Sequence, residues 1–180
     1  MAELRDVASF FIALAQDTAE MHLGDPMTHL RLQKFLYFAQ GWSLARNGKP
    51  LFAEPIEAWQ YGPVVPVCYN WYKGFGSDSL RAEMPSKDAF TLQEYELLID
   101  TWSALAKYST RQLVDMTHER GTPWDQIWNH SDARQIPTEK IEEYFADLPL
   151  PGIKDKLANI PVVEPLYRKD GVPVFAAEEA

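Results

Sequence analysis

Residues 30–45 read LRLQKFLYFAQGWSLA, and this stretch decides the fold. Large apolar side chains recur so often that they cover almost the whole circumference of a helix. A helix that is apolar all round packs on several sides and therefore lies at the centre of a fold. Thr28 suits the N-cap of this helix, and Asn47-Gly48 suits a left-handed C-terminal end. The sequence predicts a central, buried helix over residues 29–46.

About six further helices are expected around the central one, in a compact, mainly α bundle. Helical spacing of apolar residues predicts the first helix, over residues 3–22. Pro63 and Pro66 suit the start of a short helix over residues 64–73. Capping sequences at Thr91 and Ser109 predict two more helices. The remaining two are expected after Thr122-Pro123 and after Thr138, and residues 74–90 are expected to form a loop.

Two stretches break the helical pattern. Residues near 52–61 alternate with period two and include aromatic side chains, which predicts a short β or extended segment that ends in a Gly62-Pro63 turn. Residues 149–180 contain five prolines and short β-like pieces around Lys169-Asp170-Gly171, which predicts an extended tail with a hairpin. We therefore expect one domain over residues 1–148 and a Pro-rich extension over residues 149–180.

The charge is unevenly distributed along the 180 residues. Residues 1–50 carry five acidic and five basic side chains, whereas residues 51–180 carry 21 acidic and 12 basic ones, which accounts for the net charge of −9. An acidic body repels nucleic-acid phosphates and anionic membrane surfaces and favours basic partners. An acidic surface is also the ordinary state of a soluble protein, so this alternative stays open.

Cellular location is indicated by the single cysteine, Cys68, and by the hydropathy of the chain. One cysteine cannot form a disulfide framework, which fits a reducing compartment. No stretch reaches the roughly 18 apolar residues that a membrane helix needs. We expect a cytoplasmic protein.

Catalytic groups are not evident. His118-Glu119 opens a helical zinc motif, but Thr122 stands where the second histidine ligand is required. Cys68 lies in an apolar context that does not favour a thiolate, and the phosphate-binding glycine loops are missing. We expect no enzyme activity, no metal and no cofactor. The alternative, a metal- or cysteine-dependent enzyme that uses His118 or Cys68, is testable by elemental analysis.

Six large aromatic rings fall within seventeen residues, at Trp59, Tyr61, Tyr69, Trp71, Tyr72 and Phe75. Trp and Tyr contribute much of the binding energy at protein interfaces. The alternative is that these rings pack on the central helix. We expect Trp59 and Trp71 to point inward, and some of Tyr69, Tyr72 and Phe75 to point outward.

Several motifs resemble one known family. The run from Leu30 to Trp42 resembles the opening helix of the Panacea (SocA-like) antitoxin domain. The link GKPLF over residues 48–52 and the stretch EPIEAWQYGPVVP over residues 54–66 follow in the order of that family. A distal motif is similar at Leu113, Thr117-His118-Glu119, Gly121 and Pro123-Trp124. The resemblance covers roughly residues 4–130, and the tail lies outside it.

The resemblance implies an antitoxin that neutralises a cognate protein toxin by direct binding, and the acidic body suggests a basic toxin. In one branch of the family the protein is a proteolytic adaptor that delivers its toxin to a ClpXP-type protease. A phage-encoded regulator that binds a host protein is a further alternative. We place the candidate toxin contacts in the segment over residues 69–90 and in the tail, at Tyr69, Trp71, Tyr72, Phe75, Tyr167 and Phe175.

The motif residues themselves are interpreted as a scaffold. Gln33, Lys34 and Gln40 are polar positions on an otherwise apolar helix, and buried polar groups need hydrogen-bond partners. We expect them to hold the Tyr61-Gly62-Pro63 turn. The expected scaffold residues are Leu32, Gln33, Lys34, Tyr37, Trp42, Trp59, Tyr61, Gly62, Pro63, Val64, Pro66, His118, Pro123 and Trp124.

Overall fold

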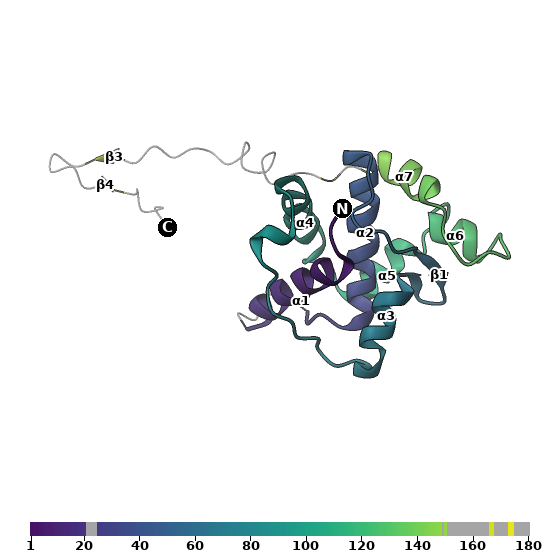
Figure 1. Ribbon diagram of the computed structural model, residues 1–180, viewed down its shortest axis with the longest axis horizontal. Coiled ribbons are helices and arrows are strands. Elements are labelled where there is room, and N and C mark those ends of the chain that lie inside the picture. The colour runs from purple at the N-terminus through teal and green to yellow at the C-terminus, as the bar shows by residue number, and fades with distance from the viewer. Residues whose placement is uncertain (21–24, 149, 151–165, 168–172, 175–180) are drawn as a thin grey trace, which may run out of the picture.

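The computed structural model describes residues 1–20, 25–148, 150, 166–167 and 173–174. Over these residues it contains seven α-helices, two 3-10 helices and two short antiparallel strand pairs (Figure 1). The mainly α fold class that the sequence predicts is confirmed. No helix in the described part of the chain is both long and apolar enough to cross a bilayer.

Helix α2, His29–Asn47, is the central element (Figure 1). Every residue from position 31 to position 44 is buried, as an all-round apolar helix requires. The Thr28 hydroxyl accepts from the Arg31 amide at its start. At its end Gly48 adopts a φ of 62° and donates its amide to the Leu44 carbonyl. Both predicted caps of the central helix are confirmed.

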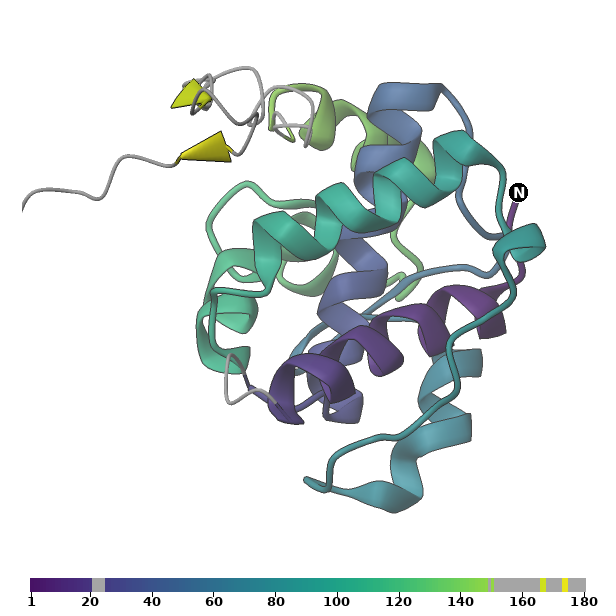
Figure 2. The ribbon, with the colours of Figure 1, turned by 90° about the vertical axis from the view of Figure 1, so that its left-hand side faces the viewer.

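In the described part of the chain, five of the other six helices pack directly on α2, and the helix over residues 123–128 packs on the hairpin and on the last helix. Figure 2 shows α1 and α4 lying across one face of α2. The capping boxes predicted at Thr91 and Ser109 are both formed and open α4 and α5. The bounds are Leu4–Glu20 for α1, Pro66–Tyr72 for α3, Leu92–Leu105 for α4, Thr110–Thr117 for α5, Pro123–Trp128 for α6 and Thr138–Ala146 for α7.

The segment that follows α3 differs from the expected loop. It contains two short 3-10 helices, η1 over Lys73–Phe75 and η2 over Lys87–Ala89. The Ser86 hydroxyl accepts from the Asp88 amide and so caps the second one. Between the two, the Leu80 amide donates to the Met27 carbonyl at 2.7 Å, which fixes the connection against the start of α2.

Aromatic rings link the outer helices to α2. Phe35 contacts Phe11 of α1 and Trp102 of α4, with ring centroids 5.2 and 5.4 Å apart. On the other side of α2, Phe145 of α7 packs against Tyr37, Phe38 and Trp42 at 5.3 to 5.7 Å. The Phe145 ring occupies the space that a side chain at Gly41 would need, so α7 approaches α2 closely.

The extended segment is a β-hairpin, and the predicted turn is wrong. Strand β1, Glu57–Trp59, pairs with strand β2, Gly62–Val64, so Gly62 and Pro63 belong to the second strand. The turn is formed by Gln60 and Tyr61. Proline is tolerated at the edge of a sheet because its missing amide costs no ladder bond there.

The other edge of the hairpin pairs with the chain that leads into α7. The Ala58 amide donates to the Arg134 carbonyl, and the Ile136 amide donates to the Ile56 carbonyl, at 2.7 and 2.8 Å. This pairing ties residues 134–136 to the hairpin and so positions α7.

In the tail, β3 at Leu166–Tyr167 pairs antiparallel with β4 at Pro173–Val174. The predicted turn at Lys169-Asp170-Gly171 and the candidate contact Phe175 lie outside the described residues, as does the side chain of Tyr167. The domain boundary near residue 148 stays a prediction.

Candidate functional site: the signature frame and the surfaces beside it

Gln40 of α2 fixes the link that follows the central helix. Its Oε1 accepts from the Leu51 and Phe52 amides at 2.8 and 3.2 Å, and its Nε2 donates to the Phe52 carbonyl at 3.0 Å. All of these groups are buried, where unpaired backbone groups are costly. The Gln40 side chain thus supplies hydrogen bonds to backbone groups of the buried link, which has no regular secondary structure to pair them.

Gln33 and Lys34 hold the end of the hairpin. The Gln33 Oε1 accepts from the Val65 amide at 2.7 Å. The Lys34 Nζ donates to the Pro63 carbonyl at 3.1 Å, and this lysine is fully buried. Burial disfavours the charged amine and lowers the pKa of Lys34 from 10.5 to about 7.

Gly62 lets the hairpin approach this amine. Its φ is 98°, and a side chain there would collide with the Lys34 amine and the Thr117 hydroxyl. The Thr117 hydroxyl donates to the Val114 carbonyl and belongs to α5. Residues from α2, β2 and α5 therefore converge on one point beneath the hairpin. We call this cluster, with Gln33, Lys34, Gly62 and Thr117 at its centre, the signature frame.

The distal motif joins the same frame through Trp124 of α6. Its Nε1 donates to the Trp59 carbonyl at 2.7 Å, and its ring lies 3.9 Å from that of His118. Burial lowers the pKa of His118, the positive charges of Lys34 and Arg111 lower it further, and only Asp115 opposes them. The sequence motifs around residues 59 and 124 thus meet in space.

Most of the expected scaffold residues lie inside the protein. Trp59, Pro66 and His118 are half-buried, and Tyr61 at the hairpin turn is 61% exposed. The remaining members are buried, namely Leu32, Gln33, Lys34, Tyr37, Trp42, Gly62, Pro63, Val64, Pro123 and Trp124. Their role as a scaffold stays a prediction, and Tyr61 is the member whose side chain faces outward.

Arg31 is a further buried polar residue of α2, and it was not among the site residues expected from the sequence. It is buried and donates to the Tyr108 carbonyl at 2.7 Å and to the Ala106 carbonyl at 3.1 Å. These carbonyls follow the end of α4, where helix carbonyls lack partners. The sequence contained a signal for this residue, because an arginine inside a helix that is apolar all round needs hydrogen-bond acceptors in the core.

The candidate toxin contacts lie on α3 and η1. Val67 and Trp71 lie one turn apart on α3, and Phe75 follows on η1 with its ring 6.3 Å from that of Tyr72. Val67 is 40% and Phe75 48% exposed, and we call Val67, Trp71 and Phe75 the contact stripe. Trp71 is half-buried beneath the Arg5 guanidinium, 4.2 Å from its ring. Tyr69 and Tyr72 are also half-buried, and Trp59 packs on Tyr69 at 4.8 Å. Whether this stripe contacts a toxin stays a prediction.

Two groups with possible reactivity are Cys68 and the histidines. Burial raises the pKa of the Cys68 thiol to about 12, and a nearby Gln33 hydrogen bond only partly offsets this. A thiol with so high a pKa is protonated at neutral pH and is a poor nucleophile. Over the described ranges, no group of three or more His, Cys, Asp or Glu side chains is arranged to hold a metal.

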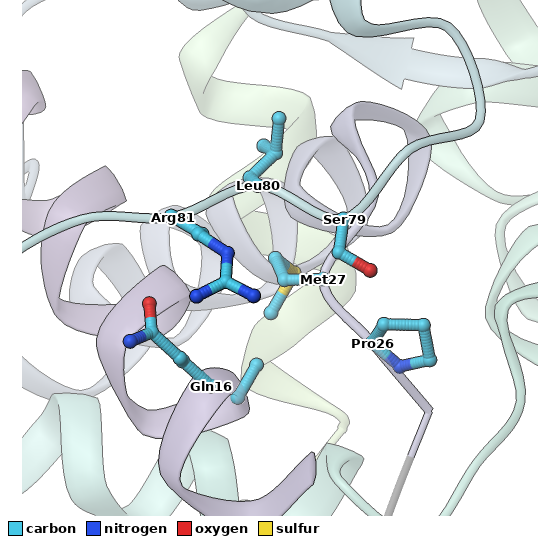
Figure 3. A pocket seen from close by; sticks show the side chains of 7 residues that line it. Gln16, Pro26, Met27, Ser79, Leu80 and Arg81 are labelled. Atoms are coloured by element: carbon cyan, nitrogen blue, oxygen red, sulfur yellow. The ribbon is translucent and has the colours of Figure 1, made fainter. Parts of the chain in front are cut away.

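A pocket of about 220 Å³ opens between α1, the residues just before α2 and the segment after η1 (Figure 3). Figure 3 shows the Gln16 amide and the Arg81 guanidinium at one end, with Pro26 and Ser79 at the other. The lining residues are Ala15, Gln16, Pro26, Met27, Ser79, Leu80 and Arg81.

Comparison with known proteins decides the family. Residues 32–125, just over half of the chain, match the profile of the family described as "Antitoxin SocA-like, Panacea domain". This chain belongs to that family. The match begins in α2 and ends in α6, so it contains the Gln33, Lys34, His118 and Trp124 side chains of the signature frame. Helices α1 and α7 lie outside the matched range of the Panacea domain.

One curated relative is the antitoxin SocA of Caulobacter vibrioides (strain NA1000 / CB15N). It is 33% identical over 115 residues, which cover 58% of this chain and 61% of that protein. The chain therefore spans about three-fifths of the length of this relative. No solved structure matches this Panacea-domain chain significantly.

Proposed function

We propose that this protein is an antitoxin that neutralises a cognate protein toxin by direct, stoichiometric binding. The observation that carries the proposal is the match to the SocA-like Panacea family, whose separate motifs meet in one frame around Lys34, Gly62 and Trp124. The proposal includes a non-catalytic role and a cytoplasmic location, where Cys68 remains reduced.

The stripe of Val67, Trp71 and Phe75 is the proposed contact surface for the toxin. It carries exposed apolar area and a half-buried tryptophan, the combination found at energetic centres of interfaces. It also lies on α3 and η1, outside the hydrogen-bonded frame, so changes to its exposed members Val67 and Phe75 should leave that frame intact. A basic toxin is favoured by the net charge of −9.

The test is co-expression with the product of the adjacent gene. We expect that product to stop growth alone, and growth to resume when this protein is present and the two co-purify. A Val67→Asp/Phe75→Asp double variant is expected to weaken toxin binding at least about tenfold, because it places two charges in an apolar contact. Leu92→Asp serves as the matched control, since Leu92 is 75% exposed on α4.

The outcome has three distinguishable forms. A neighbour that is harmless alone and does not co-purify contradicts the antitoxin role. Toxin binding that is unchanged in the double variant contradicts only the proposal that Val67, Trp71 and Phe75 form the contact surface. A toxin whose half-life shortens when this protein and a ClpXP-type protease are both present would instead favour the proteolytic adaptor.

A further inference from the structure

The pocket beside α1 has a preformed wall. The Leu80 amide donates to the Met27 carbonyl at 2.7 Å, and the Asp78 amide donates to the Phe75 carbonyl at 2.9 Å. The first bond holds the segment after η1 against the residues that enter α2, and the second forms a turn at the start of that segment. Backbone pairing therefore fixes one wall of the pocket.

The inner surface of the pocket is apolar. Ala15, Met27 and Leu80 are 1%, 1% and 3% exposed, so only small parts of each face the opening. The volume of about 220 Å³ is below the roughly 300–1,000 Å³ of pockets that hold drug-sized ligands. A space of this size suits a single side chain.

One end of the pocket is polar and incompletely paired. The Gln16 Oε1 is buried and has no hydrogen-bond partner among the described residues. A buried acceptor without a donor carries a desolvation cost that a ligand can remove. The Arg81 guanidinium, an exposed donor, points toward the same end (Figure 3).

We propose that this pocket receives one tyrosine side chain of the protein partner. The ring would contact Met27 and Leu80, and the phenol hydroxyl would donate to the Gln16 amide oxygen and accept from the Arg81 guanidinium. A phenol is both donor and acceptor, so it fits either orientation of the Gln16 amide. Tyrosine combines an apolar ring with a polar tip, which is why it is enriched at interfaces.

This inference rests on the proposed antitoxin function only for the identity of the partner. The chemistry of the pocket is independent of it. The pocket also adjoins the proposed contact stripe in sequence, because Ser79 follows Phe75 by four residues.

The first test uses small probes on the full chain. N-acetyltyrosinamide and N-acetylphenylalaninamide differ only in the hydroxyl, and their binding is followed by amide chemical shifts in NMR. We expect the tyrosine probe to shift the signals of Gln16, Met27 and Leu80, and to bind about fivefold more tightly than the phenylalanine probe, the factor of one neutral hydrogen bond.

Substitution identifies the groups. Gln16→Leu and Arg81→Ala are each expected to reduce the preference for tyrosine to near unity. Gln93→Leu is the matched control, because Gln93 is exposed and lines a separate hollow near Lys49 and Glu94. Equal binding of both probes, shifts elsewhere on the protein, or a preference that survives Gln16→Leu would overturn the proposal.

The second test uses the co-purifying partner. Gln16→Leu is expected to weaken partner binding about fivefold, and Gln93→Leu to leave it unchanged. Unchanged partner binding in Gln16→Leu overturns the partner assignment. If no partner binds even the unsubstituted protein, the antitoxin proposal fails, and the probe experiment still decides what the pocket accepts.

Discussion

Lys34 places an amine inside the core of the protein. Its amine has one hydrogen-bond acceptor, the Pro63 carbonyl, and no carboxylate forms an ion pair with it among the described residues. A lysine amine has three donors when charged, so burial leaves two without a matched acceptor. This residue therefore links the signature frame to solution pH.

The free energy of unfolding should depend on pH through Lys34. Its pKa is about 7 in the folded state and about 10.5 in the unfolded state. Between these values the unfolded chain binds a proton that the folded chain lacks, so stability rises with pH across this window. Below pH 7 the amine is protonated in both states. The full destabilisation caused by burying a charged amine then remains, and its upper limit is about 5 kcal/mol.

Lys34→Met is expected to raise stability at pH 6 to 7 and to lose this advantage by pH 10, where the wild-type lysine is neutral. Urea unfolding of both proteins from pH 6 to pH 10 measures the difference. Lys49→Met at an exposed site is the control and should give a parallel profile. A Lys34→Met profile parallel to wild type would show that the buried amine does not titrate in this range.

Gly62 offers a second test at the same point. Gly62→Ala should lower stability by about 2–4 kcal/mol, because a left-handed backbone and a collision with Lys34 and Thr117 add together. Gly121→Ala is a matched control, since Gly121 has a φ of 87° but open space around it. Thermal or urea unfolding should show the smaller loss, about 1 kcal/mol, for Gly121→Ala.

Similar losses for both glycine variants would contradict the tight fit of the hairpin against Lys34.

At the scale of elements, α7 extends the fold beyond the matched family range. It packs on α2 through Phe145, whose ring fills the space beside Gly41. The Trp42 Nε1 also donates to the Leu148 carbonyl just after α7, at 2.9 Å. The central helix is thus covered on this side by a segment that the family profile does not include.

Phe145→Ala is expected to destabilise the protein by about 3–5 kcal/mol, because it removes a buried ring and leaves a cavity next to Gly41. Glu143→Ala on the exposed side of the same helix is the control and should change stability by less than about 0.5 kcal/mol. Denaturant unfolding gives both values. A small loss for Phe145→Ala would mean that α7 docks only weakly on α2.

At the scale of the whole molecule, charge should govern how fast the partner is captured. The chain carries a net charge of −9, and unlike charges on two proteins accelerate their encounter. If the toxin is basic, its association rate constant should fall about tenfold between low salt and about 0.5 M NaCl, while dissociation changes less. Stopped-flow mixing at several salt concentrations measures both rates.

A salt-independent association rate would contradict a basic partner and leave the binding proposal itself intact.

Much of the fold could be predicted from local rules. The central helix follows from apolar residues on all its faces, and its ends follow from Thr28 and Gly48. The capping boxes at Thr91 and Ser109 also act within three residues, so the sequence shows them directly. The family motifs were equally visible, because they are strings of neighbouring residues.

Only the tertiary structure determined which elements pair with and contact one another. The prediction of a turn at Gly62-Pro63 was wrong, because both residues pair with residues 57–59 and so belong to a strand. The polar side chains of α2 showed that hydrogen-bond partners were needed but not which ones. Trp124 donates to the Trp59 carbonyl across 65 positions of sequence. The pocket beside Gln16 is formed by three segments that only packing brings together.

The sequence by itself determined the helices, their caps and the family, because these depend on residues a few positions apart. The tertiary structure alone decided the burial of the Lys34 amine, the docking of α7 and the outward surfaces. These depend on contacts between distant segments, and such contacts are set by how side-chain volumes and hydrogen bonds are satisfied together in one core.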